Sequence, residues 1–206
     1  KGYLKALREL TEENDILLIF DEIITGFRVS LGGAQELLGV TPDLCTMAKA
    51  LGGGFPIAAI GGKADVMDVV GIGKVIHMGT MNANPLVLAA SKATLEILEG
   101  GALKALNDTG RKLVKGIQEV IADKHAHALV QGFGSVFQVY FTDLQEIRNY
   151  RDFLRVDSGK YAEFAAKLLN EKIWISPSPN MHWFVSSAHT KEDVDSALEA
   201  TAKAMM

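Results

Sequence analysis

Two short apolar runs, each followed by an ionisable residue, constrain the fold of this chain more than any other feature. The run "DILLIF" (15–20) leads into Asp21, and "DLCTMA" (43–48) leads into Lys49. Uninterrupted apolar runs of this length are typical of strands that are buried on both faces of an α/β sheet. The intervening chain holds a short helical pattern, "GAQELLG" (33–39), and is long enough for a parallel crossover. We therefore predict two parallel strands that place Asp21 and Lys49 at the same edge of one sheet.

The rest of the first hundred residues predicts a mixed sheet with flanking helices. A third apolar run, "PIAAIGG" (56–62), is separated from the second only by Gly52–Phe55. That connection is too short for a helical crossover, so the third strand should run antiparallel to the second. Asn84-Pro85 provides a capping side chain and a proline for a first helical turn, and Gly100-Gly101 should end the long helix that begins there. The remaining predictions are a first helix with Leu4, Leu7 and Leu10 at helical spacing, a helix over 64–70 and a loop over 71–83.

After Gly100-Gly101 the pattern changes to that of an α+β layer. The stretch "ALVQGFGSVFQVYFT" (128–142) contains glycines between apolar segments, which predicts a strand pair or a bulged strand. We place the domain boundary at the paired glycines, which gives domains 1–100 and 101–206. The other predicted elements are helices at about 102–124 and 158–171, strands at "IWISPS" (173–178) and "HWFVSSAH" (182–189), and a final helix over 190–205 with Thr190 as its cap and Glu192 and Asp193 in its first turn.

Composition directs the search for function towards small molecules. The 206 residues include 21 Lys and Arg against 25 Asp and Glu without a long basic cluster, so we predict no nucleic-acid partner and no membrane partner. The apolar runs are too short to cross a bilayer and the N-terminus lacks the order of a signal peptide, which predicts a cytoplasmic location. The one cysteine, Cys45, should be a small buried hydrophobe in its strand. The five histidines show no ligand spacing except His125 and His127 on a polar helix end, so no metal is predicted.

Asp21 and Lys49 form the candidate site, because ligands in open α/β sheets bind beyond the carboxyl ends of the strands. A lysine among apolar neighbours should be partly desolvated, which favours a neutral, nucleophilic amine and Schiff-base chemistry. From the decapeptide around Lys49 alone, a lysine that extends into solvent before a glycine turn is an equal alternative. Asp21 has its own alternative, since a carboxylate at a strand end commonly caps the next helix or pairs with an arginine such as Arg28.

Three sequence blocks, taken together, resemble a known family. "LIFDEIITGF", "PDLCTMAKALGGGFPIAAIGG" and "GTMNANPL" are similar in content and order to the signature of the class III aminotransferases, which are pyridoxal-phosphate (PLP) enzymes of fold type I. "GSVFQVYFTD" and "WISPSPNMHWFVSSAHTKEDVDSALEA" are most similar to the branch that contains glutamate-1-semialdehyde 2,1-aminomutase. The resemblance implies an α/β fold made of the C-terminal part of the large, mixed-sheet PLP-binding domain, followed by an α+β small domain.

The resemblance also implies a role for individual residues. Lys49 would form the Schiff base and move a proton during the reaction, and Asp21 would face the pyridine nitrogen and keep it protonated. Ile23, at a position where the family usually has valine, would pack against one face of the ring. Gly79 and Thr80 would bind the cofactor phosphate, with Thr80 reaching across the interface of a homodimer. Glu22 would not touch the cofactor and would instead support the residues that do.

The family's large domain begins well upstream of Lys1, so the resemblance implies that half of a composite site is contributed by a complementary N-terminal half. We expect that half as a separate chain or a missing segment, together with a homodimer and a small-molecule amino substrate. The alternative is a catalytically inactive fragment that serves as a structural or interaction module. The aminomutase proper has a glutamate where Met181 or its neighbours stand here, so mutase and transaminase activity both remain open.

Overall fold

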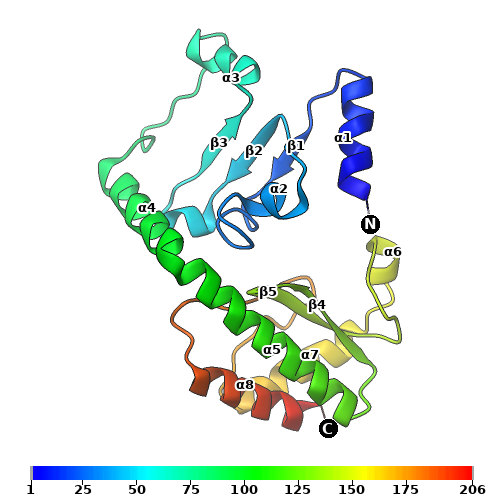
Figure 1. Cartoon of the computed structure of the whole chain (residues 1–206). Helices are drawn as coiled ribbons and strands as arrows, with labels where there is room; N and C mark the ends of the chain where they lie inside the picture. The colour runs from blue at the N-terminus through cyan, green and yellow to red at the C-terminus, as the bar shows by residue number, and fades with distance from the viewer. Residues whose placement is uncertain (1, 206) are drawn as a thin grey trace. The chain divides into compact units, whose positions relative to one another are not determined.

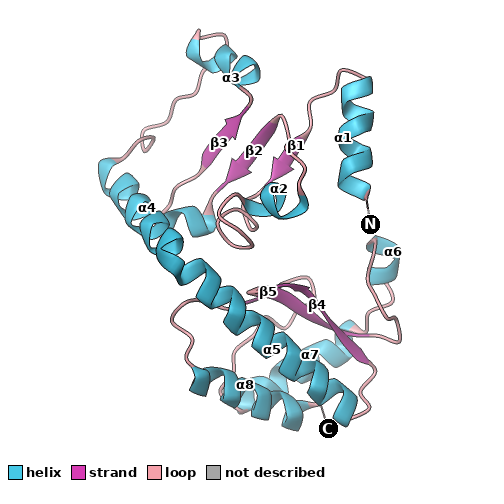
Figure 2. Cartoon of the chain, in the orientation of Figure 1, coloured by secondary structure: helices cyan, strands magenta, loops and turns pink. Residues whose placement is uncertain are grey.

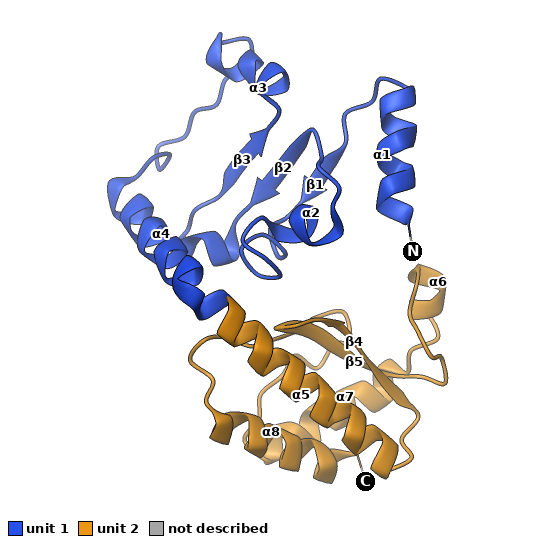
Figure 3. Ribbon diagram, in the orientation of Figure 1, with its two compact units in different colours: residues 1–103 blue, residues 104–206 orange. Residues whose placement is uncertain are grey.

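The computed structural model describes residues 2–205, and the chain divides into two compact units, residues 1–103 and 104–206 (Figure 3). Each unit contains a three-stranded sheet with its own helices (Figures 1 and 2). The division lies just after the paired glycines. Gly101 has a φ of 114°, a left-handed value that glycine tolerates and that other residues rarely adopt. Two helices therefore meet at a kink at Gly101, within the turn Leu98–Ala102, and the first of them ends at the paired glycines as the sequence predicts.

The sheet of unit 1 confirms the predicted pairing. Its order is β1-β2-β3, with β1 parallel to β2 and β3 antiparallel to β2. The crossover between the parallel strands contains the predicted short helix α2, and Cys45 is buried in β2. The elements of this unit are α1 (Tyr3–Glu13), β1 (Ile19–Asp21), α2 (Gly33–Leu38), β2 (Leu44–Met47), the 3-10 turn η1 (Lys49–Gly52), β3 (Ala59–Gly62), α3 (Ala64–Gly71), α4 (Pro85–Ile97) and the π-helical turn η2 (Leu98–Ala102).

Helix α4 begins as its sequence predicts. The side chain of Asn84 accepts hydrogen bonds from the backbone N–H groups of Leu86 and Val87, at 3.0 and 3.3 Å, and Pro85 occupies the first turn. These bonds satisfy donors that have no partner inside the helix. The local sequence therefore fixes the point at which α4 starts.

The prediction that "DILLIF" is a strand buried on both faces is wrong. The strand begins only at Ile19, and the side chains of Ile16, Leu17 and Ile19 are 56%, 53% and 57% exposed, whereas Leu18 is buried. Within the described residues β1 pairs on one side only, with β2, so its other edge and much of its apolar surface are uncovered. The apolar composition of this run is that of an inner strand.

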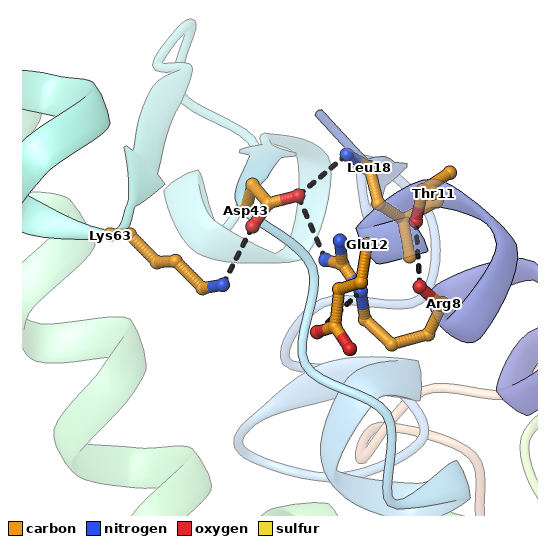
Figure 4. Close-up of polar contacts among 6 residues, drawn as sticks. All are labelled: Arg8, Thr11, Glu12, Leu18, Asp43 and Lys63. Atoms are coloured by element: carbon orange, nitrogen blue, oxygen red, sulfur yellow. Dashed lines mark hydrogen bonds and ion pairs between the residues drawn. The ribbon is translucent and has the colours of Figure 1, made fainter. Parts of the chain in front are cut away.

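A buried carboxylate ties the segments of unit 1 together. Asp43, just before β2, accepts hydrogen bonds from Lys63 Nζ at 2.7 Å, from the Leu18 N–H at 2.7 Å and from Arg8 Nη1 at 2.8 Å (Figure 4). These three donors lie after β3, before β1 and on α1. The hydrogen bond from Lys63, followed by those from Leu18 and Arg8, holds the pKa of Asp43 well below its usual range. Asp43 is therefore a charged link between four segments that are separated in sequence.

Unit 2 contains an antiparallel sheet of order β4-β5-β6. The predicted strand pair is confirmed as the β4–β5 hairpin, and the final helix has the predicted cap, in which Thr190 and Asp193 form a reciprocal capping box. The elements of this unit are α5 (Leu103–Asp123), β4 (Ala128–Phe133), β5 (Val136–Phe141), α6 (Tyr150–Phe153), α7 (Ser158–Asn170), β6 (Trp183–Phe184) and α8 (Lys191–Ala204). Helix α6 is short and was not predicted from the sequence.

Unit 2 has a continuous apolar core. Residues of α5, α7 and α8 pack against the sheet, and several side chains are wholly removed from solvent. A larger residue would not fit at Gly110 of α5, because a Cβ atom there would lie 2.3 Å from the backbone oxygen of Gly134. The buried members of the core are Leu113, Ile117, Phe137, Val139, Tyr161, Phe164, Leu168, Trp183, Val185, Ala200 and Ala204.

The predicted strand "IWISPS" does not form, and a buried polar chain instead holds the segment that follows it. Gln138 of β5 donates from Nε2 to the backbone oxygens of Pro179 and Met181, at 2.9 and 2.8 Å. Trp183 Nε1 donates to the Tyr161 hydroxyl, which donates to Gln138 Oε1. The segment before β6 is thus held by a side-chain amide and not by a strand ladder. The second predicted strand, "HWFVSSAH", is reduced to the two residues of β6.

No helix in the described part of the chain is both long and apolar enough to cross a membrane.

Candidate functional site

The candidate site lies at the end of two adjacent parallel strands. Asp21 is the last residue of β1 and is paired in register with Thr46 of β2. Lys49 follows three residues after Thr46, as the first residue of η1. Because β1 and β2 are parallel, their carboxyl ends lie at the same edge of the sheet. The backbone therefore brings the acid and the lysine to neighbouring strand ends, as the sequence predicts.

Glu22, not Asp21, caps the next helix. Its side chain is 1% exposed and accepts hydrogen bonds from the N–H groups of Ala34 and Gln35, both at 2.8 Å, and from the Thr25 hydroxyl. Ala34 and Gln35 are in the first turn of α2, whose N-cap glycine has no side chain to offer. The helix-capping role considered for Asp21 is thus taken by its neighbour Glu22.

The Asp21 side chain is exposed and held at one of its two oxygens. Oδ1 accepts a hydrogen bond from the Ile23 N–H at 3.0 Å and one from the Thr46 hydroxyl at 3.3 Å. Among residues 2–205, no hydrogen bond to Oδ2 is present. A carboxylate with one fixed and one open oxygen can accept a hydrogen bond from a ligand in a defined direction.

Lys49 is exposed, which corrects the prediction that its apolar neighbours desolvate it in this chain. The neighbouring Leu51 is buried, whereas Lys49 is exposed at the start of the turn that follows β2. Its backbone φ is 48°, in the left-handed region that non-glycine residues seldom occupy. Such a conformation costs on the order of 1 kcal/mol and is concentrated at functional sites. The turn thus sets the direction of the lysine at some energetic cost.

The other predicted site residues occupy two places in unit 1. Ile23 is half-buried in the turn after Asp21. Gly79 and Thr80 are exposed in the long loop between α3 and α4, and in the described chain Thr80 forms no hydrogen bond with the strand ends that carry Asp21 and Lys49. The structure therefore places Ile23 beside Asp21, while Gly79 and Thr80 belong to a separate loop.

Cavities within each unit are lined by other residues. A cavity of about 530 Å³ in unit 1 is lined by Glu22 and Met47 among others, and one of about 530 Å³ in unit 2 is lined by Trp174, Met181 and their neighbours. Neither includes Asp21 or Lys49. Residues 2–205 contain no cluster of His, Cys, Asp and Glu able to hold a metal ion. The two candidate residues are exposed and line neither of these two cavities.

Sequence reasoning missed the structural roles of Thr46, which lies beside the site, and of Asp43, which lies at the other end of β2. Thr46 contacts Asp21 only because the strand register places the two side by side, and no spacing in the sequence reveals that register. Asp43 has a weak sequence signal, since an acid directly before a buried strand needs partners. The identity of those partners depends on tertiary contacts.

Solved structures with the same fold include transaminases. An omega-transaminase from Sphaerobacter thermophilus matches with a TM-score of 0.87 and 31% identity, over 99% of this chain and 47% of that one. A transaminase with PLP bound matches with a TM-score of 0.87 and 27% identity, over 100% of this chain and 47% of that one. The expected α/β fold, PLP-dependent transferase fold type I, is thereby confirmed.

The family follows from the sequence comparisons. The model of the class-III aminotransferases matches residues 1–205, so this chain belongs to the class-III aminotransferase family. A relative from Archaeoglobus fulgidus, glutamate-1-semialdehyde 2,1-aminomutase, is 44% identical over 207 residues, which cover 100% of this chain and 49% of the relative. The chain thus spans about half the length of the curated relatives that it matches.

Proposed function

We propose that this chain is one half of a PLP-dependent aminotransferase or aminomutase, in which Lys49 and Asp21 are the catalytic residues. The observation that carries the proposal is the position of an aspartate and a lysine at the ends of adjacent parallel strands, in a chain of the class-III aminotransferase family. We also propose that unit 1 is the C-terminal part of the cofactor-binding domain and unit 2 the small domain.

The described residues fit such a cofactor. Asp21 presents one open carboxylate oxygen, which suits a protonated ring nitrogen, and the half-buried Ile23 beside it offers an apolar contact for a ring face. The exposed amine of Lys49 is free to reach an aldehyde carbon. The uncovered edge and the lack of enclosure support the view that this chain supplies one wall of the site.

Each residue then has a defined task. When bound, PLP supplies an electron sink that stabilises negative charge at the substrate carbon. Lys49 binds the cofactor through its amine and moves a proton to and from the substrate carbon. Asp21 holds a proton on the ring nitrogen by offering a carboxylate next to a positive charge. Gly79 and Thr80 bind the phosphate through backbone N–H and hydroxyl groups.

A complementary N-terminal half is the second part of the proposal. The exposed apolar side chains at the edge of β1 and the matched relatives' doubled length support it. That half would cover β1 and contribute the other wall of the site, either as a separate chain or as a segment of the same one. Purification from the native source followed by size-exclusion chromatography and mass spectrometry tests this. A monodisperse 22.2 kDa monomer would contradict it.

The proposed homodimer uses the loop that carries Thr80. The loop side chains Ile76, Met78 and Met81 are 77%, 82% and 66% exposed, which supports burial of this loop against another surface. If Thr80 serves the partner's site, mixing Lys49→Ala and Thr80→Ala protomers should restore about a quarter of the wild-type sites, because half of the dimers are mixed and each has one intact site. Absence of recovery in a verified mixed dimer would contradict the shared site.

The proposed substrate is a small amino compound. Met181 and its neighbours supply no acid where the aminomutase proper has a glutamate, and Met181 is 56% exposed in this chain. Both intramolecular and intermolecular amino transfer are therefore compatible with the proposal. A panel of amino donors, scored by the change in cofactor absorbance, separates them: a mutase acts on its own substrate without a second amino acceptor.

The central experiment is cofactor attachment. The protein purified from its own cells, so that any complementary half accompanies it, should show a visible absorption band that borohydride reduces, leaving a pyridoxyl group on the peptide that contains Lys49. Lys49→Ala should abolish the labelling, while Lys74→Ala, which removes another exposed lysine from the same unit, should not. A protein that shows no band after PLP is added would instead support the structural or interaction module.

A further inference from the structure

The carboxylate of Asp21 is held by donors from two different segments. The Ile23 N–H comes from the turn that follows β1, and the Thr46 hydroxyl comes from the adjacent strand β2. Both donate to Oδ1. Without them, an exposed aspartate would rotate freely about its terminal torsion, which has broad minima. The two bonds together orient the plane of the carboxylate, and among the described residues they leave Oδ2 without a hydrogen bond.

Thr46 contacts the acidic pair through both its main chain and its side chain. Its backbone oxygen accepts a hydrogen bond from the Glu22 N–H at 2.9 Å, while its hydroxyl donates to Asp21. The main-chain bond fixes the register, and the register brings the hydroxyl opposite the carboxylate. The contact between Thr46 and Asp21 is thus a consequence of strand pairing.

Thr46 also precedes Lys49 by three residues on the same segment. The strand that delivers the lysine therefore also carries the donor that orients the acid. Any shift of β2 relative to β1 would displace the lysine and release the carboxylate together. One hydroxyl thus links the positions of the two groups that must reach opposite ends of the same ring.

We propose that Thr46 is a positioning residue, whose hydroxyl holds Asp21 Oδ1 so that Oδ2 meets the cofactor's ring nitrogen in a fixed direction. This rests on the proposed function of Asp21 and Lys49. Fixing a group in its working geometry before the ligand arrives lowers the barrier because less freedom is lost on binding and reaction. The hydroxyl acts only through Asp21 and does not touch the reacting atoms.

The experiment compares Thr46→Val with Thr46→Ser in the protein purified from its own cells. Valine keeps the branched shape and favours strands, so it preserves the fold while it removes the hydroxyl, whereas serine retains the hydroxyl. Thr109→Val is the matched control, because its hydroxyl bonds only to the Ala105 oxygen within α5 of unit 2. The readouts are the dissociation constant for PLP, the pH dependence of the bound-cofactor absorption, and the rate and KM of a single amino-transfer half-reaction.

Thr46→Val should weaken PLP binding and slow the half-reaction about tenfold each, equivalent to about 1.4 kcal/mol, with KM for the amine within about twofold. It should also alter the pH dependence of the absorption. Thr46→Ser should restore most of both, and Thr109→Val should match the wild type. Borohydride labelling of Lys49 should persist in all three variants at saturating PLP.

Two results would overturn the role of Thr46. In one, Thr46→Val matches the wild type while Asp21→Asn loses affinity and rate; in the other, Thr46→Ser is as impaired as Thr46→Val. Failure of the proposed function has a different signature. In that case the wild-type protein itself is not labelled at Lys49, or Asp21→Asn is without effect.

Discussion

Units 1 and 2 each contain a three-stranded sheet, but only unit 2 buries its sheet in a continuous core. The residues of that core all belong to unit 2, whereas β1 of unit 1 leaves Ile19 in solvent, as does the segment before it with Ile16 and Leu17. The unit with the candidate catalytic residues is thus the less complete of the two. In the described residues, unit 2 thus closes around its own core, while unit 1 has apolar side chains at its β1 edge that nothing covers.

Separation of the two units should have the largest effect. A fragment of residues 101–206 should fold alone, with dispersed amide resonances and cooperative urea unfolding, because its core is closed within the fragment. A fragment of residues 1–100 should remain poorly ordered, because its sheet has an uncovered apolar edge. Cooperative unfolding of 1–100 by itself would remove the basis of the comparison.

Truncation of the core of unit 2 comes next. Phe137→Ala should cost about 3–5 kcal/mol of unfolding free energy, because Phe137 is fully buried against Trp183. Phe55 of unit 1, which is 45% exposed, is the control, and Phe55→Ala should cost less than about 1 kcal/mol. Urea unfolding of both variants is the measurement. Equal costs would show that exposure in this chain does not report on packing.

Asp43→Asn should destabilise unit 1 by about 2–3 kcal/mol, because Lys63 and Arg8 both lose the negative carboxylate with which they pair. Amide hydrogen exchange should increase in β1 and β2 and remain unchanged in β5. Asp68→Asn on the exposed surface of α3 is the control and should change stability by less than about 0.5 kcal/mol. Faster exchange in β5 of Asp43→Asn would mean that the units do not respond separately.

The same residue predicts a pH dependence. Because the pKa of Asp43 is lowered in the folded state, its contribution is fully present above its unfolded pKa, at about 3.9, and is lost as the pH falls towards the folded value. Unit 1 should therefore lose stability below about pH 4, and Asp43→Asn should reduce that slope. A slope unchanged by the substitution, measured by hydrogen exchange of β1 amides, would assign the acid sensitivity to other carboxylates.

The helix caps should give the smallest effects and the closest match between the units. Asn84→Ala in unit 1 and Thr190→Ala in unit 2 each remove a side chain that accepts from the first turn of a helix. Each should cost about 1 kcal/mol, measured by urea unfolding. Because capping is local, similar costs would show that the units differ in long-range packing and not in helix stability. A negligible cost for Asn84→Ala would indicate that α4 is held by contacts elsewhere.

The sequence by itself determined the features that depend on neighbouring residues. It predicted the parallel and antiparallel pairing of unit 1 from the lengths of the connections, the β4–β5 hairpin from its glycines, and the starts of α4 and α8 from Asn84 and Thr190. The motif around Asp21 and Lys49 indicated the family that the comparisons confirm. Connection length, turn chemistry and caps act over a few residues, so they can be read directly from the chain.

Only the tertiary structure decided which partners the polar groups find. It gave the helix-capping role to Glu22 and not to Asp21, linked four segments through Asp43, and placed the Thr46 hydroxyl on the Asp21 carboxylate. It also left the predicted strand "IWISPS" unformed, bound the backbone oxygens of Pro179 and Met181 to the Gln138 side chain, and left Lys49 exposed. The physical reason is that hydrogen bonds and burial between distant segments depend on register and on which surfaces are covered, and local sequence does not encode either of these.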